Sequence, residues 1–240
     1  MLVAGFPAAA FGTNCWVLAP AAGEECLVVD PGVDVEVPLA GVLAEHRLRP
    51  VAVLLTHGHL DHTFSVVPVA GARHIPAYIH PGDADLLVDP LRGLSPETRQ
   101  LFAGQLRWTE PDDVRPLTDG TVLDLAGLRL TVEHAPGHTP GSVLFRLPGG
   151  PARPDAEPWA GTVVVGDVLF AGSIGRTDLP GGDPVAMLRS LATRVLPLPD
   201  ATLVLPGHGP RTTVGRERAS NPFLAEAAAL AGPARSARSS

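Results

Sequence analysis

The chain has 240 residues, of which 45% are hydrophobic, so it is long enough to bury a substantial core. Its net charge is −7, and its 18 basic residues form no basic run, which argues against binding to a nucleic-acid backbone. No apolar stretch is long enough to cross a bilayer, and two cysteines are too few for a disulfide framework. We therefore expect a cytoplasmic protein whose partner is a small molecule.

Short β-rich runs recur along the chain and predict strands. They cover Asn14 to Leu18, Cys26 to Val29, Val51 to Leu55, Ala77 to Ile79, Leu128 to Val132, Val143 to Arg146, Thr162 to Val165 and Thr202 to Leu205. Helical patterns lie between several of these runs, at Val35 to His46, from near Thr63, at Gly82 to Val88, Pro96 to Phe102, Pro184 to Val195, and within Arg216 to Leu230. This order predicts an α/β fold with a mixed sheet system and helices packed outside.

No linker divides the chain, so we expect a single domain over residues 1–231. Pro148 to Pro158 is rich in proline and glycine and is predicted to be a surface loop. Residues 232–240 are predicted to be a disordered tail. The N-terminus lacks the basic region of a signal peptide, so we expect no export.

Four side chains that can bind metal lie within six positions, directly after the apolar run Val51 to Leu55. They are His57, His59, Asp61 and His62. Imidazole nitrogens and carboxylate oxygens are donors that zinc accepts, and compact spacing lets one turn of backbone aim several of them inward. A solvated loop rich in histidine is the alternative. The spacing favours a metal-binding loop.

Three further candidate donors each follow a β-rich run and a glycine. His138 comes after Leu128 to Val132, and Asp167 follows Thr162 to Val165. His208 follows Thr202 to Leu205. All the donors therefore lie at the carboxyl ends of predicted strands, where open α/β sheets usually place their sites.

These seven donors exceed what one tetrahedral zinc ion can bind, so the sequence predicts two divalent ions. We expect zinc, with iron or manganese as alternatives. Asp167 is the best candidate for a bridge, because a carboxylate has two oxygens and an imidazole offers one lone pair. With two aspartates and one hydroxide the site keeps a charge of about +1, which favours anionic substrates.

The residues resemble the metallo-β-lactamase superfamily, whose H-x-H-x-D-H signature matches His57, His59, Asp61 and His62. The resemblance implies an αβ/βα four-layer sandwich, with two mixed sheets flanked by helices. It implies that the first ion is bound by His57, His59 and His138, that the second is bound by Asp61, His62 and His208, and that Asp167 bridges them. It implies catalytic roles for Asp61 and Asp167. Asp30 matches a family position near the metal loop, although a turn-forming aspartate before proline explains it equally well.

The segment Gly166 to Asp178 is similar to glyoxalase II and its short bacterial relatives, as are Gly137 to Ser142 and Ser220 to Phe223. This resemblance implies a metal-dependent thioesterase. Its substrate would be a hydroxyacyl-thiol such as S-lactoylglutathione, hydrolysed by attack of metal-bound hydroxide.

The chain also departs from the full-length glyoxalase II enzymes. Only 32 residues of this sequence follow His208 (240 − 208 = 32), too few for their C-terminal helical domain, so we expect this sequence to lack it. Arg176-Thr177-Asp178 stands where those enzymes have lysine and tyrosine after the bridging aspartate, so the carrier thiol stays open. Arg176 either binds a substrate carboxylate or pairs with Asp178 or Asp183.

Other functions stay in competition. A persulfide dioxygenase of the same superfamily uses a single iron on residues that match His57, His138 and Asp167. A lactonase would use the same metals, and a non-catalytic scaffold would most simply show a missing donor. The remaining histidines have ordinary explanations: His46 ends a predicted helix, His74 precedes a strand, His80 serves in a cap or turn, and His134 lies in a loop.

Overall fold

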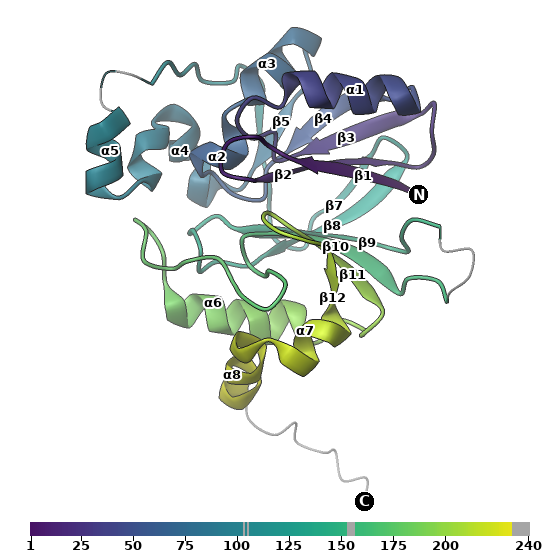
Figure 1. Ribbon diagram of the computed structural model, residues 1–240, viewed down its shortest axis with the longest axis vertical. Coiled ribbons are helices and arrows are strands. Elements are labelled where there is room, and N and C mark those ends of the chain that lie inside the picture. The colour runs from purple at the N-terminus through teal and green to yellow at the C-terminus, as the bar shows by residue number, and fades with distance from the viewer. Residues whose placement is uncertain (103, 105, 153–156, 232–240) are drawn as a thin grey trace, which may run out of the picture.

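Two six-stranded sheets face each other and carry helices on their outer faces (Figure 1). The structure is a computed structural model, and it describes residues 1–102, 104, 106–152 and 157–231. The tail predicted at 232–240 and part of the predicted 148–158 loop lie outside the described residues. The predicted sandwich of two mixed sheets between helices is confirmed.

The first sheet contains the N-terminal half of the chain. Its order is β1 (Leu2–Pro7), β2 (Asn14–Ala19), β3 (Glu25–Val29), β4 (Arg49–Leu54), β5 (Ala77–Ile79) and β6 (Val114–Pro116). The first three strands pair antiparallel, and β3 to β6 pair parallel. Parallel neighbours need a crossover, and α1 (Glu36–His46) provides the one between β3 and β4.

The second sheet contains the C-terminal half. Its order is β12 (Thr212–Thr213), β11 (Thr202–Pro206), β10 (Gly161–Gly166), β9 (Val143–Leu147), β8 (Leu128–His134) and β7 (Val122–Leu125). Only β10 and β11 pair parallel, and the other neighbours are antiparallel. The crossover between β10 and β11 contains α6 (Pro184–Ser190) and a π-helical turn at Leu191–Val195.

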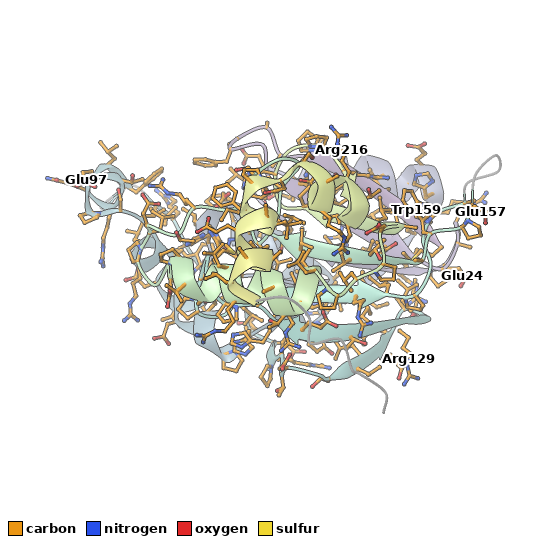
Figure 2. All side chains as sticks on the ribbon, turned by 90° about the horizontal axis from the view of Figure 1, so that it is seen from below. Glu24, Glu97, Arg129, Glu157, Trp159 and Arg216 are labelled. Carbon is orange, nitrogen blue, oxygen red and sulfur yellow. The ribbon has the colours of Figure 1, made fainter. Side chains whose placement is uncertain are left out.

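Helices cover both outer faces and one end of the sandwich. In Figure 1, α1 and α3 (Val66–Ala70) lie over the first sheet, while α6, α7 (Val214–Ser220) and α8 (Pro222–Ala231) lie over the second. In the same view, α2 (Leu60–Thr63), α4 (Ala84–Val88) and α5 (Pro96–Phe102) lie toward one end. Figure 2 shows Glu97 of α5 at this end, and Glu24 and Arg129 toward the opposite end.

Three apolar layers hold the sandwich together. Between the sheets, Trp16, Leu54 and Phe145 belong to one buried cluster. Outside the first sheet, β-strand residues pack on α1 and α3, and outside the second they pack on α6 and α8. Strands such as β2 and β10 are therefore buried on both faces, which is why their sequences are continuous apolar runs.

The predicted elements agree with the structure in most places. Several were missed or misplaced: β1, β6, β7 and β12 were not predicted, and the last helix is two helices, because Asn221 is extended and Pro222 begins α8. The helix expected from Thr63 begins at Leu60 and is followed by α3, which contains Pro68 in its first turns. His134 ends β8 and does not lie in a loop.

Both cysteines lie in the core, as predicted, and are free. Burial raises the pKa of the Cys26 thiol to about 12, so it behaves as a small apolar side chain. Within the described ranges, no helix has both the length and the apolar character required to span a bilayer. The cytoplasmic location stays a prediction.

Candidate metal centre

The metal-donor candidates meet where strands from both sheets end. His57 and His59 follow β4 of the first sheet, and α2 carries Asp61 and His62. The other donors follow strands of the second sheet: His138 lies in the β8–β9 loop, Asp167 follows β10 and His208 follows β11. The predicted placement at four strand ends is thus what the structure shows.

The donors form two compact sets, and a third group, made of His57, His62 and Asp167, joins them. In the first, the Nδ1 atom of His59 lies 2.8 Å from Nε2 of His138, which lies 3.2 Å from Nε2 of His57. All three ligand atoms lie within 4.8 Å of one another. In the second, Nε2 of His208 lies 3.3 Å from Nε2 of His62 and 3.3 Å from Oδ2 of Asp61.

Asp167 lies between the two sets. Its Oδ1 is 3.3 Å from Nε2 of His62, and its Oδ2 is 3.6 Å from Nε2 of His138 and 3.5 Å from Nε2 of His208. Asp167 is 9% exposed, and its Oδ1 is buried without a hydrogen-bond partner among the described residues. A carboxylate oxygen in that position requires a cation or a donor.

These distances fit metal coordination. Two ligands at about 2.05 Å from one tetrahedral ion lie about 3.3 Å apart. The separations of His138 from His57 and of His62 from His208, 3.2 and 3.3 Å, agree with this value, and that of His59 from His138 is shorter at 2.8 Å. The chemistry of the donor set fits too, since imidazoles and carboxylates suit zinc, iron or manganese. The two sets are those expected for a dinuclear centre, although they do not identify the metal.

Three histidines have their protonated nitrogen fixed on the side away from the centre. Nδ1 of His138 donates to the carbonyl oxygen of Arg176 at 2.7 Å, and Nδ1 of His62 donates to Asp30 at 3.0 Å. The Thr56 hydroxyl donates to Asp30, so it accepts from Nδ1 of His57 at 3.1 Å. In the neutral imidazole, each Nε2 then carries the lone pair that faces the other donors.

Asp30 serves this centre as a support. Its carboxylate accepts from the backbone N–H of Thr56 at 2.8 Å and from the Thr56 hydroxyl at 2.6 Å, in addition to His62. Asp30 is buried and has φ 50°, so the turn geometry and the orienting role coincide in one residue. The two explanations offered by the sequence therefore both apply.

The electrostatics favour the deprotonated form of four donors and the protonated form of His62 and His208, whose pKa values are raised by the neighbouring carboxylates. Burial lowers the pKa of His59 to about 3, and burial with the surrounding imidazoles holds the pKa of His57 well below its usual value. For Asp61 and Asp167, burial alone would raise the pKa, but His62 and the other histidines outweigh it and lower both carboxyl pKa values. Burial alone would lower the pKa of His62, but Asp167 and Asp61 outweigh it and raise that pKa.

Thr13, which ends the β1–β2 loop, and Asn14, which begins β2, were not predicted to take part, yet they support the second set. The Thr13 hydroxyl donates to Asp61 at 2.9 Å, and the Asn14 side chain donates to the carbonyl oxygens of Pro206 and Gly209 on either side of His208. Two buried polar residues at the start of an apolar strand were the available signal of a supporting role. That role could not be predicted, because the residues they contact are far away in the sequence.

Two glycines allow the donor loops to approach one another. A Cβ on Gly207 would overlap Oδ1 of Asp167 and crowd the ring of His62, and a Cβ on Gly166, at φ 49°, would overlap the Thr56 hydroxyl. The glycine before each of these donors is therefore required by close contact.

A cavity of about 500 Å³ opens onto the donors. Four apolar side chains line it together with polar ones from the segment around α5, and its walls include Phe11, Leu94, Ser95, Thr98, Phe170, Arg176 and Leu179. Leu94, Ser95 and Thr98 place the segment just before and within α5 on one side of the site. The ring of Phe170 also packs edge-on against His208.

Arg176 lies on the wall of this cavity. Its guanidinium binds the Asp178 carboxylate through two hydrogen bonds of 2.7 and 2.8 Å, whereas Asp183 caps the start of α6. The pairing with Asp178 is therefore present, and the pairing with Asp183 is not. Substrate binding by Arg176 stays a prediction.

The remaining histidines lie away from the centre. His46 ends α1 and His74 follows the 3-10 turn Gly71–Arg73. His80 caps the 3-10 turn Pro81–Asp83 by accepting from the backbone N–H of Gly82, as predicted, and its ring stacks on that of His134 with centroids 4.1 Å apart.

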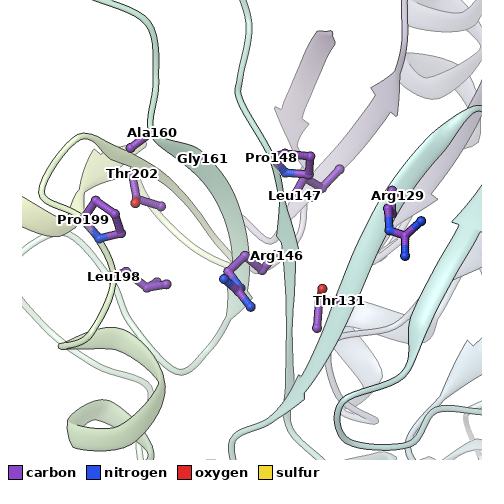
Figure 3. A pocket seen from close by; sticks show the side chains of 10 residues that line it. All are labelled: Arg129, Thr131, Arg146, Leu147, Pro148, Ala160, Gly161, Leu198, Pro199 and Thr202. Carbon is purple, nitrogen blue, oxygen red and sulfur yellow. The ribbon is translucent and has the colours of Figure 1, made fainter.

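A second hollow, of about 380 Å³, lies at the opposite ends of β10 and β11 (Figure 3). Its two arginines are already paired, Arg146 with Glu133 at 2.8 Å and Arg129 with Asp124 at 3.8 Å. The hollow therefore offers no unbalanced charge that would mark it as a binding site.

Comparison with known proteins decides the family. The family model of the metallo-beta-lactamase superfamily matches residues 8–208, a range that includes every donor. The chain belongs to the metallo-beta-lactamase superfamily. It is 46% identical over 225 residues to an uncharacterized protein of Mycobacterium tuberculosis, covering 93% of this chain and 98% of that protein. It is 34% identical to hydroxyacylglutathione hydrolase GloC of Haemophilus influenzae, covering 91% of this chain and 95% of GloC.

Solved structures of the superfamily agree with this placement. BLEG-1, described as a B3 metallo-beta-lactamase, is 37% identical, with a TM-score of 0.78 over 93% of this chain and 99% of that one. TTHA1623, solved in a di-iron-bound form, is 38% identical, with a TM-score of 0.73 over 92% of this chain and 100% of that one. ETHE1 from Myxococcus xanthus, at 21% identity and a TM-score of 0.70 over 98% of this chain and 93% of that one, shares the fold alone.

Proposed function

We propose that this superfamily member is a dinuclear metal-dependent thioesterase acting on hydroxyacyl-thiols of the S-lactoylglutathione type. The observation that supports this most strongly is the position of Asp167, which lies between 3.3 and 3.6 Å from histidine nitrogens of both donor sets. In this proposal His57, His59 and His138 hold one ion, Asp61, His62 and His208 hold the other, and Asp167 bridges them. The ions are zinc, with iron or manganese as alternatives.

The chain's own groups fit hydrolysis of an anionic acyl compound. When bound, two divalent ions supply a nucleophile from water near neutral pH and polarise the acyl carbonyl. Asp61 and Asp167 stay ionised and reduce the charge of the centre without cancelling it, which attracts an anion. A thiolate leaves without prior protonation, so the reaction needs no general acid.

The cavity walls suit such a substrate. Phe11, Leu94, Phe170 and Leu179 offer apolar surface to an acyl group and exclude water around it. On the same wall, Arg176 can exchange its exposed partner Asp178 for a substrate carboxylate, because both groups are more than half exposed. The proposed partner is thus a small anionic thioester.

Two relatives support this choice. The name of GloC, which the chain resembles over most of its length, states a hydroxyacylglutathione hydrolase. The di-iron form of TTHA1623 supports two ions and makes iron a serious alternative to zinc.

The persulfide dioxygenase is the weaker candidate. A single iron on His57, His138 and Asp167 would leave the second set, Asp61, His62 and His208, without a ligand to bind, although these donors lie within 4.8 Å of one another. A lactonase, or the β-lactamase activity stated for BLEG-1, would use the same centre and must be separated by substrate.

The test combines metal analysis with a substrate panel. Protein loaded with zinc, iron or manganese is assayed for thiol release from S-lactoylglutathione and other hydroxyacyl-thiols, for opening of lactones and β-lactams, and for oxygen uptake with glutathione persulfide. We expect about two ions per chain and thiol release as the fastest reaction. Oxygen uptake supported by one iron, or ring opening without thiol release, would refute the proposal.

A further inference from the structure

Asp83 is a fully buried carboxylate near the centre, yet it belongs to neither donor set. It ends the 3-10 turn Pro81–Asp83 after β5 and is 0% exposed. Within the described part of the chain no arginine or histidine pairs with it. Three hydrogen-bond donors stabilise its charge instead. Burying a carboxylate without a cationic partner costs free energy, so its position calls for an explanation.

The three donors come from the two loops that carry the first set. Oδ2 of Asp83 accepts from the backbone N–H of Gly58 at 2.9 Å and from the Thr139 hydroxyl at 2.6 Å. Oδ1 accepts from the backbone N–H of Gly141 at 2.6 Å. Gly58 lies between His57 and His59, and Thr139 follows His138. One carboxylate therefore ties together the loops of all three ligands, across both sheets.

Close packing makes this link specific. A Cβ on Gly141 would lie 2.5 to 2.6 Å from atoms of Asp83, and a Cβ on Gly58 would lie 2.9 Å from the Asp83 carbonyl oxygen and 2.8 Å from Cβ of Leu86. The Thr139 hydroxyl is held in turn by Ser142 at 2.8 Å. The loops approach Asp83 closely only because both contact positions are glycine.

The second set is supported by different residues. Asp30 orients His62, Thr13 contacts Asp61, and Asn14 holds the backbone on either side of His208. Asp83 makes none of these contacts. The supports of the two sets therefore differ, apart from Thr56, which joins Asp30 to His57.

We propose that Asp83 is a positioning residue for the first metal ion, fixing the relative placement of His57, His59 and His138. This rests on the two-ion centre of the proposed function and not on its substrate. Asparagine at this position has one acceptor oxygen, so its amide would face at least one backbone N–H. The loops should then separate while the second set stays in place.

The experiment isolates each set. His208→Ala breaks the second set and leaves the first, whereas His138→Ala does the reverse. Asp83→Asn is added to each variant, and the metal-free proteins are titrated with Co²⁺, with affinity measured by calorimetry and coordination by visible absorption. Asp85→Asn is the control, because it makes the same change two residues away on an exposed side chain.

We expect Asp83→Asn to weaken Co²⁺ binding about 10- to 100-fold in the His208→Ala protein and to change its absorption spectrum. In the His138→Ala protein the affinity should stay within about twofold. Thr139→Val removes one of the three hydrogen bonds and should cost about fivefold, with recovery in Thr139→Ser; this pair keeps the test possible if Asp83→Asn does not fold.

Equal losses in both backgrounds, accompanied by a lower melting temperature of the metal-free protein, would show a general structural role and overturn the proposal. Unchanged Co²⁺ affinity in the His208→Ala background would overturn it as well. Neither the Co²⁺ affinity nor the absorption spectrum depends on turnover. Failure of the thioesterase proposal would therefore be recognised separately, as a chain that binds two ions and releases no thiol. A wild-type chain that does not bind Co²⁺ would instead refute the two-ion centre itself.

Discussion

At the scale of single residues, the partner of each histidine decides which nitrogen faces the ions. Thr56, Asp30 and the Arg176 carbonyl oxygen accept from Nδ1 of His57, His62 and His138, so Nε2 is the nitrogen that faces the ions in each. The first four ligand candidates could be predicted because their spacing along the chain is compact, and the other three because each follows a β-rich run and a glycine. Their orientation could not, since the Arg176 carbonyl lies 38 residues from His138 and Asp30 lies 32 residues from His62.

Arg176 tests the substrate assignment at this scale. Arg176→Ala should raise KM for anionic thioesters about three- to tenfold and leave kcat nearly unchanged, because it removes ground-state binding at an exposed site. Asp178→Asn should lower the same KM, since it frees the guanidinium. The measurement is steady-state kinetics on an anionic and a neutral thioester. An equal rise of KM for both substrates would contradict a carboxylate contact.

His62 makes metal binding depend on pH. In the metal-free protein, Asp167 and Asp61 raise its pKa against the effect of burial, so near neutral pH it holds a proton that must leave before Nε2 binds metal. Metal binding should therefore release protons and strengthen as pH rises above the ordinary histidine value of 6.5. Calorimetry in buffers of different ionisation enthalpy measures this release. Affinity that stays constant, or falls as pH rises, would contradict the assignment of His62 as a ligand.

At the scale of elements, two-sided burial explains which strands were predictable. Central strands such as β2 and β10 are buried on both faces and read as apolar runs, whereas β7 is partly exposed and β6 and β12 have three and two residues. The edge strands were therefore missed. The donors were found because each follows a central strand, and a glycine precedes each donor of the second sheet.

Gly207→Ala tests the close contact of the β11 loop. The new Cβ would overlap Asp167 and crowd His62, so we expect at least about tenfold weaker metal binding and a matching loss of activity. Gly41→Ala is the control, because that glycine lies in α1 with open space around it. The control should bind metal normally and gain about 0.5–1 kcal/mol of unfolding free energy. Normal metal binding by Gly207→Ala would show that the loop can shift freely.

At the scale of the whole molecule, the first donor set joins the two halves of the sandwich. His57 and His59 follow a strand of the first sheet, and His138 follows a strand of the second. The β-rich runs predicted a mixed sheet system, and the two-sheet sandwich came from the family resemblance. The runs alone could not show how the sheets face each other, because that depends on the buried apolar layer between them. For the same reason Asp83 was missed: its partner Gly141 lies 58 residues away on the other sheet.

Metal removal should therefore destabilise the entire fold. At a free metal concentration about 100 times the dissociation constant, each ion adds about 2.7 kcal/mol, or about 5 to 10 °C in melting temperature. Chelation followed by calorimetric melting measures this difference, and restoring the metal should reverse it. An unchanged melting temperature would contradict binding of the ions between the two sheets.

The most direct measurement is the number of ions bound per chain in the wild type and in Asp167→Ala, by equilibrium dialysis of metal-free protein. The bridging position of Asp167 predicts about two ions in the wild type, with loss of tight binding at both sites and of turnover in the variant. A wild-type chain that binds one ion, or an Asp167→Ala chain that keeps two ions and full activity, would contradict the dinuclear centre.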